Sequence, residues 1–370
     1  MLNQPKRLAI VMPSFYEQLI GGAEHQTYLL ADAAKRRGYD VHYIFVSEAS
    51  PYRNHLKLTL HTICPIRLPK RFGAFWWVYC LSAGRLLRKI RPDAVYVRGG
   101  WSFAGMAAAY ARRHRCSSTW HVASSADVTP RPFLSLIKRP SSWIEQKAIE
   151  YAIRYSTHVV AQANYQSRLL LERYGRESTV IMNQQPEPEE ALDKSGPFTV
   201  AWVGNIKPLK QPEMFIRLAA EFVGNRSVRF VMIGRPAGGK YQSGLDVAIR
   251  ECGNLEYLGE QPIEKVNAIL AQSHLLVNTS LYEGFSNTFV QAWMREVPVV
   301  SMLLDPDGIL TTRKIGFFSG SFERMIRDVR TLVEDPALRD EMQKRAREYA
   351  SENHSLKKNM DRLLDLVMAE

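Results

Sequence analysis

A carboxylate, a glycine and several small polar residues stand together in the second half of the sequence. The run Ser280–Thr288 (SLYEGFSNT) directly follows the apolar segment 275–279 and contains Glu283. A carboxylate accepts hydrogen bonds from sugar hydroxyls, and backbone amides at the start of a helix attract negative charge. The combination suits a sugar linked to a phosphate, with Gln291 two helical turns after Glu283 on the same face. Helix capping without a ligand is the alternative use of these residues.

A second loop of the same kind comes earlier in the chain. The segment Trp202–Lys210 (WVGNIKPLK) follows a strand-like apolar run and contains Lys207 and Lys210. Both lysines could extend over the strand end, where a diphosphate would lie. Because isolated loop lysines are usually only solvated, this prediction depends on the neighbouring Glu283 run.

A glycine pair, Gly21-Gly22, lies where a helical pattern begins. Glycines let backbone N–H groups approach a ligand closely, and a helix N-terminus favours anions. The pair is not part of a GxGxxG sequence, and no acidic residue follows at dinucleotide spacing, so a nicotinamide site is only weakly indicated. A simple turn could use the same two glycines.

Short runs that are apolar at every position alternate with helical patterns, which is typical of strands buried on both faces of a parallel sheet. We expect strands at 8–12, 41–46, 94–97, 118–121 and 158–161, and again at 199–204, 228–234, 275–279 and 298–302. We expect amphipathic helices at 23–37, 103–113, 213–222, 263–272 and 287–295. The alternation predicts βαβ units with right-handed crossovers.

The pattern begins again near residue 198, after a segment at 184–196 that is rich in Pro, Glu and Asp and has no apolar period. The sequence therefore predicts an α/β protein with two doubly wound Rossmann-like domains, 1–185 and 197–350, joined by a linker. The segment 351–370 is expected to hold a C-terminal helix that could cross back to the first domain. Ligands of open α/β sheets bind beyond the carboxyl ends of the strands, so the two domains are expected to face each other across a cleft.

Charge is distributed unevenly between the two halves. The net charge is +12, and residues 1–190 hold 26 Lys and Arg against 14 Asp and Glu, whereas residues 191–370 hold 23 of each. This suggests an anionic partner for the first half, although a solvated basic face would look the same. The four cysteines lack CxxC spacing, which argues against a disulfide framework and a zinc site. With no apolar run near the ~20 residues of a membrane-spanning helix, we expect a cytoplasmic protein.

Residues 282–300 (YEGFSNTFVQAWMREVPVV) resemble the signature of the retaining family 4 glycosyltransferases, also called the group 1 family, which have the GT-B fold. The Gly21-Gly22-Ala23-Glu24 loop, the VGNIKPLK segment and the run 254–259 (NLEYLG) match the family in order and spacing. The resemblance covers nearly the whole chain, more loosely at 50–150. It implies a nucleotide-sugar substrate, such as a UDP- or GDP-sugar, and a retaining transfer without a metal or cofactor. The sequence Asp305-Pro306-Asp307 follows a late strand and is better explained as a turn than as a metal site.

The resemblance also implies roles for single residues. Glu283 would accept the donor sugar's hydroxyls, Lys210 would neutralise the leaving diphosphate, and His121 would lie close to the sugar. Backbone contacts to the sugar and the phosphate would come from Gly284, Phe285, Ser286 and Asn287. Gly21 and Gly22 would line the N-terminal side of the site, near the diphosphate. The leaving diphosphate itself would help take the acceptor's proton.

Two positions depart from the family pattern. Beside Gly204, where the family commonly has Arg, this chain has Asn205, which removes one phosphate-binding charge. The usual second carboxylate of the Glu-x7-Glu motif, which binds the ribose, is Gln291 here. Glutamine can still accept and donate a hydrogen bond. We expect altered donor contacts, with Lys207 as a candidate to restore charge.

Aromatic and basic residues are interleaved in the first half. Phe72, Phe75, Trp76 and Trp77 stand beside Lys70 and Arg71, before a helical stretch that ends in Arg85, Arg88, Lys89 and Arg91. A second cluster consists of Arg131, Phe133, Leu134, Lys138, Arg139 and Trp143. Such segments suit docking on an anionic leaflet, although aromatic residues covered by cations in a core would show the same pattern. No nucleic-acid-binding motif is present.

We therefore predict a glycosyltransferase of bacterial surface polysaccharide or lipopolysaccharide biosynthesis, acting on a glycan or lipid-linked acceptor at the inner face of the cytoplasmic membrane. A catalytically silent subunit that partners an active transferase is the alternative, motivated by Asn205 and Gln291. An NAD-dependent oxidoreductase shares the domain type and stays as a third hypothesis.

Overall fold

The computed structural model describes residues 5–17, 21–48, 52–66, 76–99, 102–129, 140–189 and 192–369. The chain divides into two compact units. The first unit consists of residues 1–183 and 357–370, and the second unit consists of residues 184–356. The segment 184–196, expected as a linker, therefore lies in the second unit, and the end of the chain belongs to the first.

The first unit contains a parallel sheet with the strand order β3-β2-β1-β4-β5-β6-β7 among its described residues. The strands are β1 (Arg7–Val11), β2 (Asp40–Val46), β3 (Thr59–Ile63), β4 (Ala94–Arg98), β5 (Ser117–His121), β6 (His158–Ala161) and β7 (Thr179–Val180). The helices are α1 (Gly22–Arg36), α2 (Trp76–Ile90), α3 (Ser102–His114), α5 (Pro140–Tyr155), α6 (Asn164–Tyr174) and α14 (Leu356–Val367).

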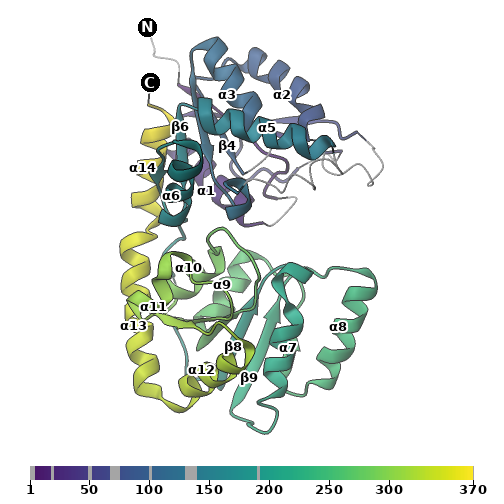
Figure 1. Ribbon diagram of the computed structural model, residues 1–370, viewed down its shortest axis with the longest axis vertical. Helices are drawn as coiled ribbons and strands as arrows, with labels where there is room; N and C mark the ends of the chain where they lie inside the picture. The colour runs from purple at the N-terminus through teal and green to yellow at the C-terminus, as the bar shows by residue number, and fades with distance from the viewer. Residues whose placement is uncertain are drawn as a thin grey trace. The chain divides into compact units, whose positions relative to one another are not determined.

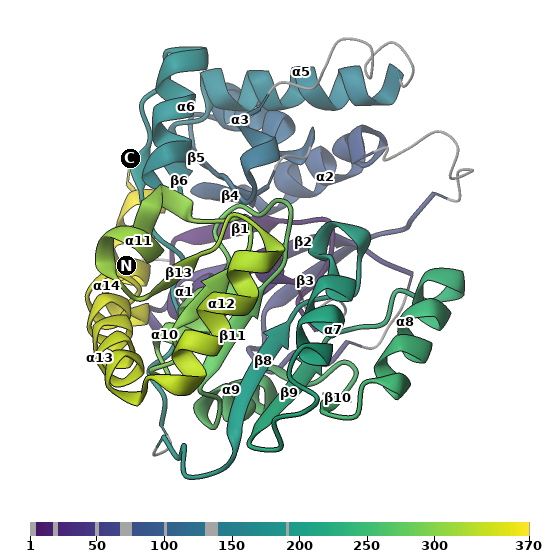
Figure 2. The ribbon, with the colours of Figure 1, turned by 60° about the horizontal axis from the view of Figure 1, so that its bottom comes forward.

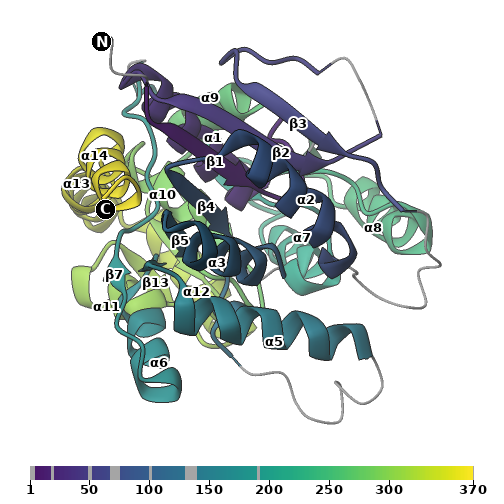
Figure 3. The same cartoon turned by 90° about the horizontal axis from the view of Figure 1, so that it is seen from above.

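Small residues let two helices of the first unit pack closely. Helices α3 and α5 lie side by side in Figures 1 and 3. A Cβ atom added at Gly105 of α3 would come within 2.5 Å of the Ala148 carbonyl oxygen of α5, so only glycine fits there. Their apolar faces and that of α2 cover β1 and β4, and the resulting core includes Trp120, which is 1% exposed.

The C-terminal helix α14 is fastened to the first unit by polar contacts as well as apolar ones. Arg37, which follows α1, forms ion pairs of 2.6 Å with Asp361 and with Asp365. The Asn359 side chain donates to the Met182 carbonyl oxygen at 3.2 Å. Met360 and Leu364 are buried. This helix thus completes the first unit although it comes last in the sequence.

The second unit contains a parallel sheet with the strand order β10-β9-β8-β11-β12-β13. The strands are β8 (Phe198–Val203), β9 (Val228–Ile233), β10 (Leu255–Tyr257), β11 (Leu275–Asn278), β12 (Val299–Ser301) and β13 (Gly316–Phe318). The helices are α7 (Pro212–Ala220), α8 (Gly239–Glu251), α9 (Ile263–Ala271), α10 (Asn287–Trp293), α11 (Ile309–Arg313), α12 (Phe322–Glu334) and α13 (Pro336–Asn353). Figure 2 shows β8 next to β9, with α7 lying close to both strands.

The strands and helices expected from apolar patterns are confirmed to within about two residues. Strand β3 was not expected, because it lies at a sheet edge where only Ile63 of its five residues is buried. Strands β10 and β13 have three residues each and occupy the two edges of the second sheet. Edge strands lack the continuous apolar run that identifies a strand buried on both faces.

Candidate functional site

The two loops singled out in the second half meet because their strands are neighbours. Strand β8 pairs with β11 in parallel, with Leu275 opposite Val200. The carboxyl ends of both strands therefore lie at the same edge of the sheet, and so do the loops that follow them. The Leu281 N–H donates to the Leu209 carbonyl oxygen at 2.9 Å, which joins the loops directly.

Lys210 and Glu283 form an ion pair between these two loops. The Lys210 Nζ atom lies 2.8 Å from the Glu283 Oε1 atom, and the two side chains are 25% and 14% exposed. Asn278 donates to the same oxygen at 2.9 Å, and the Ser280 hydroxyl donates to it at 2.7 Å. A carboxylate with three donors on one oxygen is fixed in orientation. The pair remains within reach of solvent and of a ligand.

The environment of Glu283 favours its charged form. Burial alone would raise its pKa, but the charge and hydrogen bond of Lys210, helped by Ser280 and Asn278, outweigh burial and lower the pKa of Glu283. The carboxylate is therefore ionised at neutral pH. It can accept hydrogen bonds from hydroxyl groups, and it holds no proton to give to a leaving group.

The backbone under Lys210 is held by buried side chains. The Thr279 hydroxyl donates to the Lys210 carbonyl oxygen at 2.6 Å, and the Trp202 indole N–H donates to Thr279 at 3.0 Å. Thr279 and Trp202 are 0% and 2% exposed. Sequence reasoning did not single out either residue, although both stand at strand ends next to the predicted site.

The glycine of the β8 loop is approached closely by a second glycine. A Cβ atom added at Gly234 would lie 1.8 Å from the Gly204 carbonyl oxygen, so any other residue at 234 would displace this loop. Asn205 is half-buried, and Lys207 is exposed. The structure brings these residues to the same edge as Glu283, and their contact with a donor stays a prediction.

The residues after Glu283 divide between loop and core. The Ser286 and Thr288 hydroxyls lie 2.9 Å apart at the start of α10. The Phe285 side chain is 5% exposed and packs against Trp293 and His354, so only its backbone could contact a ligand. Gly284 and Asn287 are half-buried.

Gln291 faces a neighbouring helix. The residue is 4% exposed, and its side-chain amide donates to the side-chain Oδ1 atom of Asn267 in α9 at 3.1 Å. The predicted ribose contact would have to share this amide or use the side-chain oxygen. Of the predicted donor-site side chains in the second unit, Gln291 is therefore among the least accessible.

His121 of the first unit lies at the carboxyl end of β5, inside a buried polar cluster. The sheet register places Arg98, the last residue of β4, opposite His121, and the two side chains are 2% and 1% exposed. The Tyr96 hydroxyl lies 2.8 Å from His121 Nδ1. Burial, together with the Arg98 charge, holds the pKa of His121 well below its usual range. His121 is a neutral imidazole at physiological pH.

Arg98 has only neutral hydrogen-bond partners among the described residues. One of its terminal nitrogens donates to Asn183 Oδ1 at 2.5 Å and lies 3.4 Å from Gln162 Oε1. The other lies 3.2 Å and 3.3 Å from the two ring nitrogens of His121. Sequence reasoning missed Arg98. The available signal was an arginine that continues a run of four apolar strand residues.

The glycine pair of the first unit is where the sequence placed it. Gly21 is the residue before α1, and Gly22 is the first residue of that helix. Gly21 has φ −130°, which any residue adopts. A Cβ atom there would meet only the flexible end of Glu24, whose carboxylate accepts from the Ser14 hydroxyl at 2.9 Å. The backbone geometry therefore does not demand glycine at position 21.

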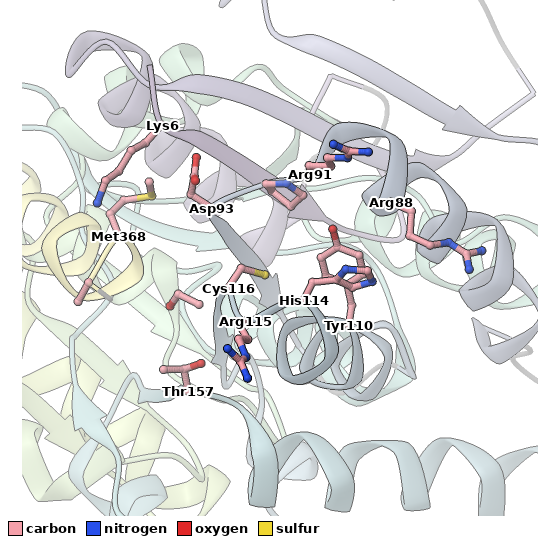
Figure 4. Close-up of a pocket in the computed structure, with 13 residues that line it drawn as sticks. Lys6, Arg88, Arg91, Asp93, Tyr110, His114, Arg115, Cys116, Thr157 and Met368 are labelled. Carbon is pink, nitrogen blue, oxygen red and sulfur yellow. The ribbon is translucent and has the colours of Figure 1, made fainter. Parts of the chain in front are cut away.

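A pocket of about 830 Å³ in the first unit lies at the opposite edge of the sheet from His121. Its lining includes residues that directly precede strands: Lys6 before β1, Asp93 before β4 and Cys116 before β5. Figure 4 shows these residues with Arg91 and Arg115 around the same space. The pocket is thus basic, and it is not at the edge where the sequence predicts donor binding.

The sequence Asp305-Pro306-Asp307 forms a turn. Asp305 Oδ1 accepts a hydrogen bond from the Leu310 N–H in the first turn of α11 at 2.8 Å. Asp307 has a φ of 56° in the left-handed region. In the described part of the chain, no group of three His, Cys, Asp or Glu residues could hold a metal ion.

The predicted membrane-docking segments are described only in part. Lys70, Arg71, Phe72 and Phe75, and the cluster from Arg131 to Arg139, lie outside the described residues. Of the remaining aromatic residues, Trp77 of α2 is 37% exposed and Trp143 of α5 is 53% exposed. Within the described ranges no helix has both the length and the apolar character needed to cross a membrane.

Comparison with known families gives matches along most of the chain. Residues 20–183 match the model described as Glycosyltransferase Family 4, and residues 183–349 match the model described as Glycosyl transferases group 1. The D-inositol 3-phosphate glycosyltransferase of Nocardia farcinica is 30% identical over 125 residues, which are 32% of this chain and 27% of that protein. Matched segments span less than half the length of the first curated relatives.

Solved structures of glycosyltransferases have the same fold. HepE of Anabaena, in a complex with UDP and glucose, superposes with a TM-score of 0.75 at 16% identity and covers 99% of this chain and 100% of its own. WaaG, a glycosyltransferase involved in lipopolysaccharide biosynthesis, gives a TM-score of 0.75 at 15% identity over 98% and 100% of the two chains. The predicted GT-B fold with two Rossmann-like domains is confirmed.

Proposed function

Because the chain belongs to the group 1 glycosyltransferase family, we propose that it transfers a sugar from a nucleoside diphosphate donor to a glycan or lipid-linked acceptor. The observation that carries this proposal is the Lys210–Glu283 pair at the adjoining ends of β8 and β11. The pair combines one cation and one carboxylate where a diphosphate and a sugar would need them.

The pair can exchange its internal contact for contacts to the donor. Lys210 would turn to the diphosphate, whose negative charge it neutralises, and Glu283 would accept hydrogen bonds from the sugar hydroxyls. Each side chain satisfies the other while the donor is absent. Asn278 and Ser280 keep the carboxylate in place when Lys210 leaves it.

We propose a retaining transfer that needs no metal ion, as the family resemblance implies. The bond from the acceptor oxygen to the anomeric carbon forms on the same face as the bond to the diphosphate oxygen breaks. The acceptor's proton passes to the leaving diphosphate. Lys210 stabilises the negative charge that develops there, and Glu283, already ionised, orients the sugar.

A thermal-shift panel of UDP, GDP, ADP, CMP and NAD tests the donor site. A ligand that binds only the folded protein raises its stability by mass action. We expect one nucleoside diphosphate to raise the melting temperature, with UDP favoured because the HepE structure contains it. Lys210→Ala should abolish the shift, whereas Lys344→Ala, which changes an exposed lysine of α13, should keep it. A shift with NAD alone would refute the proposal.

A non-catalytic GT-B subunit is the second candidate, and the state of Gln291 favours it. The residue that stands where the family has a carboxylate is buried and bonded to Asn267. Hydrolysis of the donor by the purified chain would exclude this candidate. If Gln291→Glu created a hydrolysis that the natural chain lacks, the silent-subunit function would replace the transferase.

We also propose that the first unit docks on an anionic membrane surface, where a lipid-linked acceptor would be found. Trp77 and Leu81 stand one helical turn apart on α2 and are 37% and 73% exposed. The Trp77 N–H donates to Glu145 of α5 at 3.1 Å, so the exposed Trp143 on α5 belongs to the same neighbourhood. The positive charge of residues 1–190 supports this surface, and a role in surface polysaccharide or lipopolysaccharide biosynthesis would follow from it.

Co-sedimentation with vesicles tests the docking surface. Vesicles containing phosphatidylglycerol should bind the protein, and vesicles of phosphatidylcholine alone should not. A Trp77→Ala, Trp143→Ala double variant should bind several-fold more weakly. Leu171→Ala is the matched control, because Leu171 is 54% exposed on α6, outside this neighbourhood, and its loss should change nothing. Equal binding by the double variant would refute the surface.

A further inference from the structure

A basic pocket lies at the edge of the first sheet opposite to His121, and the proposed transfer does not use it. Its volume is about 830 Å³. Arg88 lies in the last turn of α2, Arg91 follows that helix, and Arg115 follows α3. Figure 4 shows Arg88, Arg115 and Lys6 at three separate places around this space. Cations from three parts of the chain therefore line one pocket.

The positive charge of the pocket is not neutralised by acidic side chains. In the described part of the chain, Arg88, Arg91 and Arg115 form no ion pair, and all three are exposed. The one carboxylate in the described lining, that of Asp93, accepts a hydrogen bond from the Arg7 backbone N–H at 2.7 Å. The lining thus keeps an excess of positive charge.

Two of the arginines act on the same aromatic wall of the pocket. Burial raises the pKa of Tyr110, and the charges of Arg91 and Arg88 oppose this rise. The ring of the exposed His114 stacks on the Tyr110 ring, with the two centroids 4.3 Å apart. This wall combines positive charge with a flat apolar surface, which is the combination that an organic anion needs.

Two of the arginines also stand where the backbone favours glycine. Arg91 has a φ of 51° after α2, and Arg115 has a φ of 53° after α3. The left-handed region is unfavourable for a residue with a Cβ atom, and glycine is the usual residue at such a helix end. A cation there interacts favourably with the helix dipole, but any helix end would offer that gain. The same exception at two helix ends on one pocket indicates that the side chains are used.

A buried hydroxyl in the lining lacks a hydrogen-bond partner. Ser117, the first residue of β5, lines the pocket and is 8% exposed. Its Oγ atom has no partner among the described residues. The next hydroxyl along the strand, that of Ser118, lies 3.4 Å from the Thr157 hydroxyl. Because buried hydroxyls are normally paired, the Ser117 hydroxyl is a donor that a ligand in the pocket can use.

We propose that this pocket binds a phosphate group carried by an organic molecule, with Arg88, Arg91 and Arg115 as the cations and Ser117 as a neutral donor. A phosphate group carries a charge of about −1.5 to −2 at neutral pH, and it accepts paired hydrogen bonds from a guanidinium group. A volume of about 830 Å³ lies within the range of small-molecule sites, so an organic part fits beside the phosphate.

The phosphate can belong to a soluble molecule or to the headgroup of an anionic lipid, because the chemistry that recognises it is the same. The inference does not depend on the proposed transfer. Lys210 and Glu283 belong to the second unit, whereas the whole lining of the pocket belongs to the first.

Titration calorimetry with inorganic pyrophosphate tests the soluble source. The double variant Arg91→Gly, Arg115→Gly removes two cations and places glycine in left-handed backbone, so we expect its melting temperature to be close to that of the natural chain. It should bind pyrophosphate at least tenfold more weakly. Lys57→Gly, Lys314→Gly is the matched control, because these exposed lysines have φ values of 50° and 52° and lie outside the pocket. It should bind like the natural chain.

A Lys210→Ala variant separates this pocket from the proposed donor site, which pyrophosphate could also reach. We expect Lys210→Ala to keep the binding that the double arginine variant loses. If pyrophosphate binding depended on Lys210 and not on the arginines, the inference would fail while the proposed donor site stood. If the arginine variant lost pyrophosphate binding and no nucleotide shifted the melting temperature of any variant, the proposed function alone would fail.

Vesicles containing phosphatidylglycerol test the headgroup source. If a lipid headgroup occupies the pocket, the double arginine variant should co-sediment several-fold more weakly than the double lysine control, and pyrophosphate should compete with the vesicles. If the ligand is soluble, only pyrophosphate binding should differ between these two variants. Equal behaviour of the two variants in both assays would overturn the inference and leave Arg91 and Arg115 as ordinary cations at helix ends.

Discussion

Lys210 in the second unit and Arg98 in the first unit are both cations at the carboxyl edge of a parallel sheet, and their surroundings differ. Lys210 faces the Glu283 carboxylate and is 25% exposed, whereas Arg98 faces amide, hydroxyl and imidazole groups and is 2% exposed. A paired and accessible charge can exchange its partner for a ligand. A buried charge without a carboxylate partner cannot exchange its contacts for a ligand. It affects only the groups that are packed around it.

The difference indicates that the two cations are used differently. Lys210 is available to a ligand, whereas Arg98 is fixed among neutral groups. Burying a cation among neutral groups is costly unless each of its donors is paired. Around Arg98 the cost is reduced by the side-chain oxygens of Asn183 and Gln162 and by the neutral imidazole of His121. Lys210 is paired with the Glu283 carboxylate, and a donor diphosphate could take the place of that carboxylate.

Removing the accessible charge should have the largest effect. We expect Lys210→Ala to lower kcat by roughly a hundredfold to a thousandfold, the range for losing one group that stabilises developing negative charge. Initial rates at saturating donor measure it. Lys344→Ala, the control on an exposed lysine of α13, should leave kcat unchanged. Equal losses in both variants would show that kcat follows the overall positive charge and not the pair with Glu283.

A substitution in the backbone that supports the loop after β8 should have the next largest effect, on stability. In Gly234→Ala the new Cβ atom would lie 1.8 Å from the Gly204 carbonyl oxygen, which forces the two loops apart. Overpacking of this kind costs about 1–3 kcal/mol of unfolding free energy. Gly244→Ala within α8 meets no atom within 4 Å and should be neutral or slightly stabilising. Urea unfolding distinguishes the two, and equal stability would show that the loops separate freely.

Removing a hydrogen-bond partner of the buried Arg98 should lower stability more than it lowers donor binding. Asn183→Ala removes the acceptor at 2.5 Å from Arg98 and leaves a guanidinium N–H unpaired in the interior. We expect a loss of about 1–3 kcal/mol in unfolding free energy, with the thermal shift caused by the nucleotide retained. If Asn183→Ala abolished nucleotide binding at unchanged stability, the division between the two cations would be wrong.

The sequence identified Glu283, Lys210 and His121 as candidate site residues but missed Arg98, for physical reasons. Glu283 and Lys210 follow strands that pair in parallel, so the topology alone brings them to one edge. Arg98 continues the run 94–97, and its burial depends on Asn183, which is 85 residues away. No periodic pattern encodes such a contact.

Two further features depend on packing between helices. Gln291 is predicted to contact a ribose, and in the structure its amide donates to the Asn267 side chain, because α9 lies against α10. The Phe285 side chain belongs to the core through Trp293 and His354. Spacing along the sequence cannot show which of these side chains a neighbouring helix covers.

The smallest expected effect concerns the charge of Glu283 itself. Burial opposes ionisation and Lys210 overcomes it, so the pKa of Glu283 lies below that of the unfolded chain. A lowered pKa contributes stability above the unfolded value of about 4.3, and this contribution is lost as the pH falls through the folded value.

Between about pH 6 and pH 3 the natural chain should therefore lose more stability than Glu283→Gln, by about 1 kcal/mol or less. Glu264→Gln, at an exposed position of α9, is the control and should follow the natural chain. If Glu283→Gln also followed the natural chain, Lys210 would be a free cation in solution, and the contrast with Arg98 would rest on burial alone.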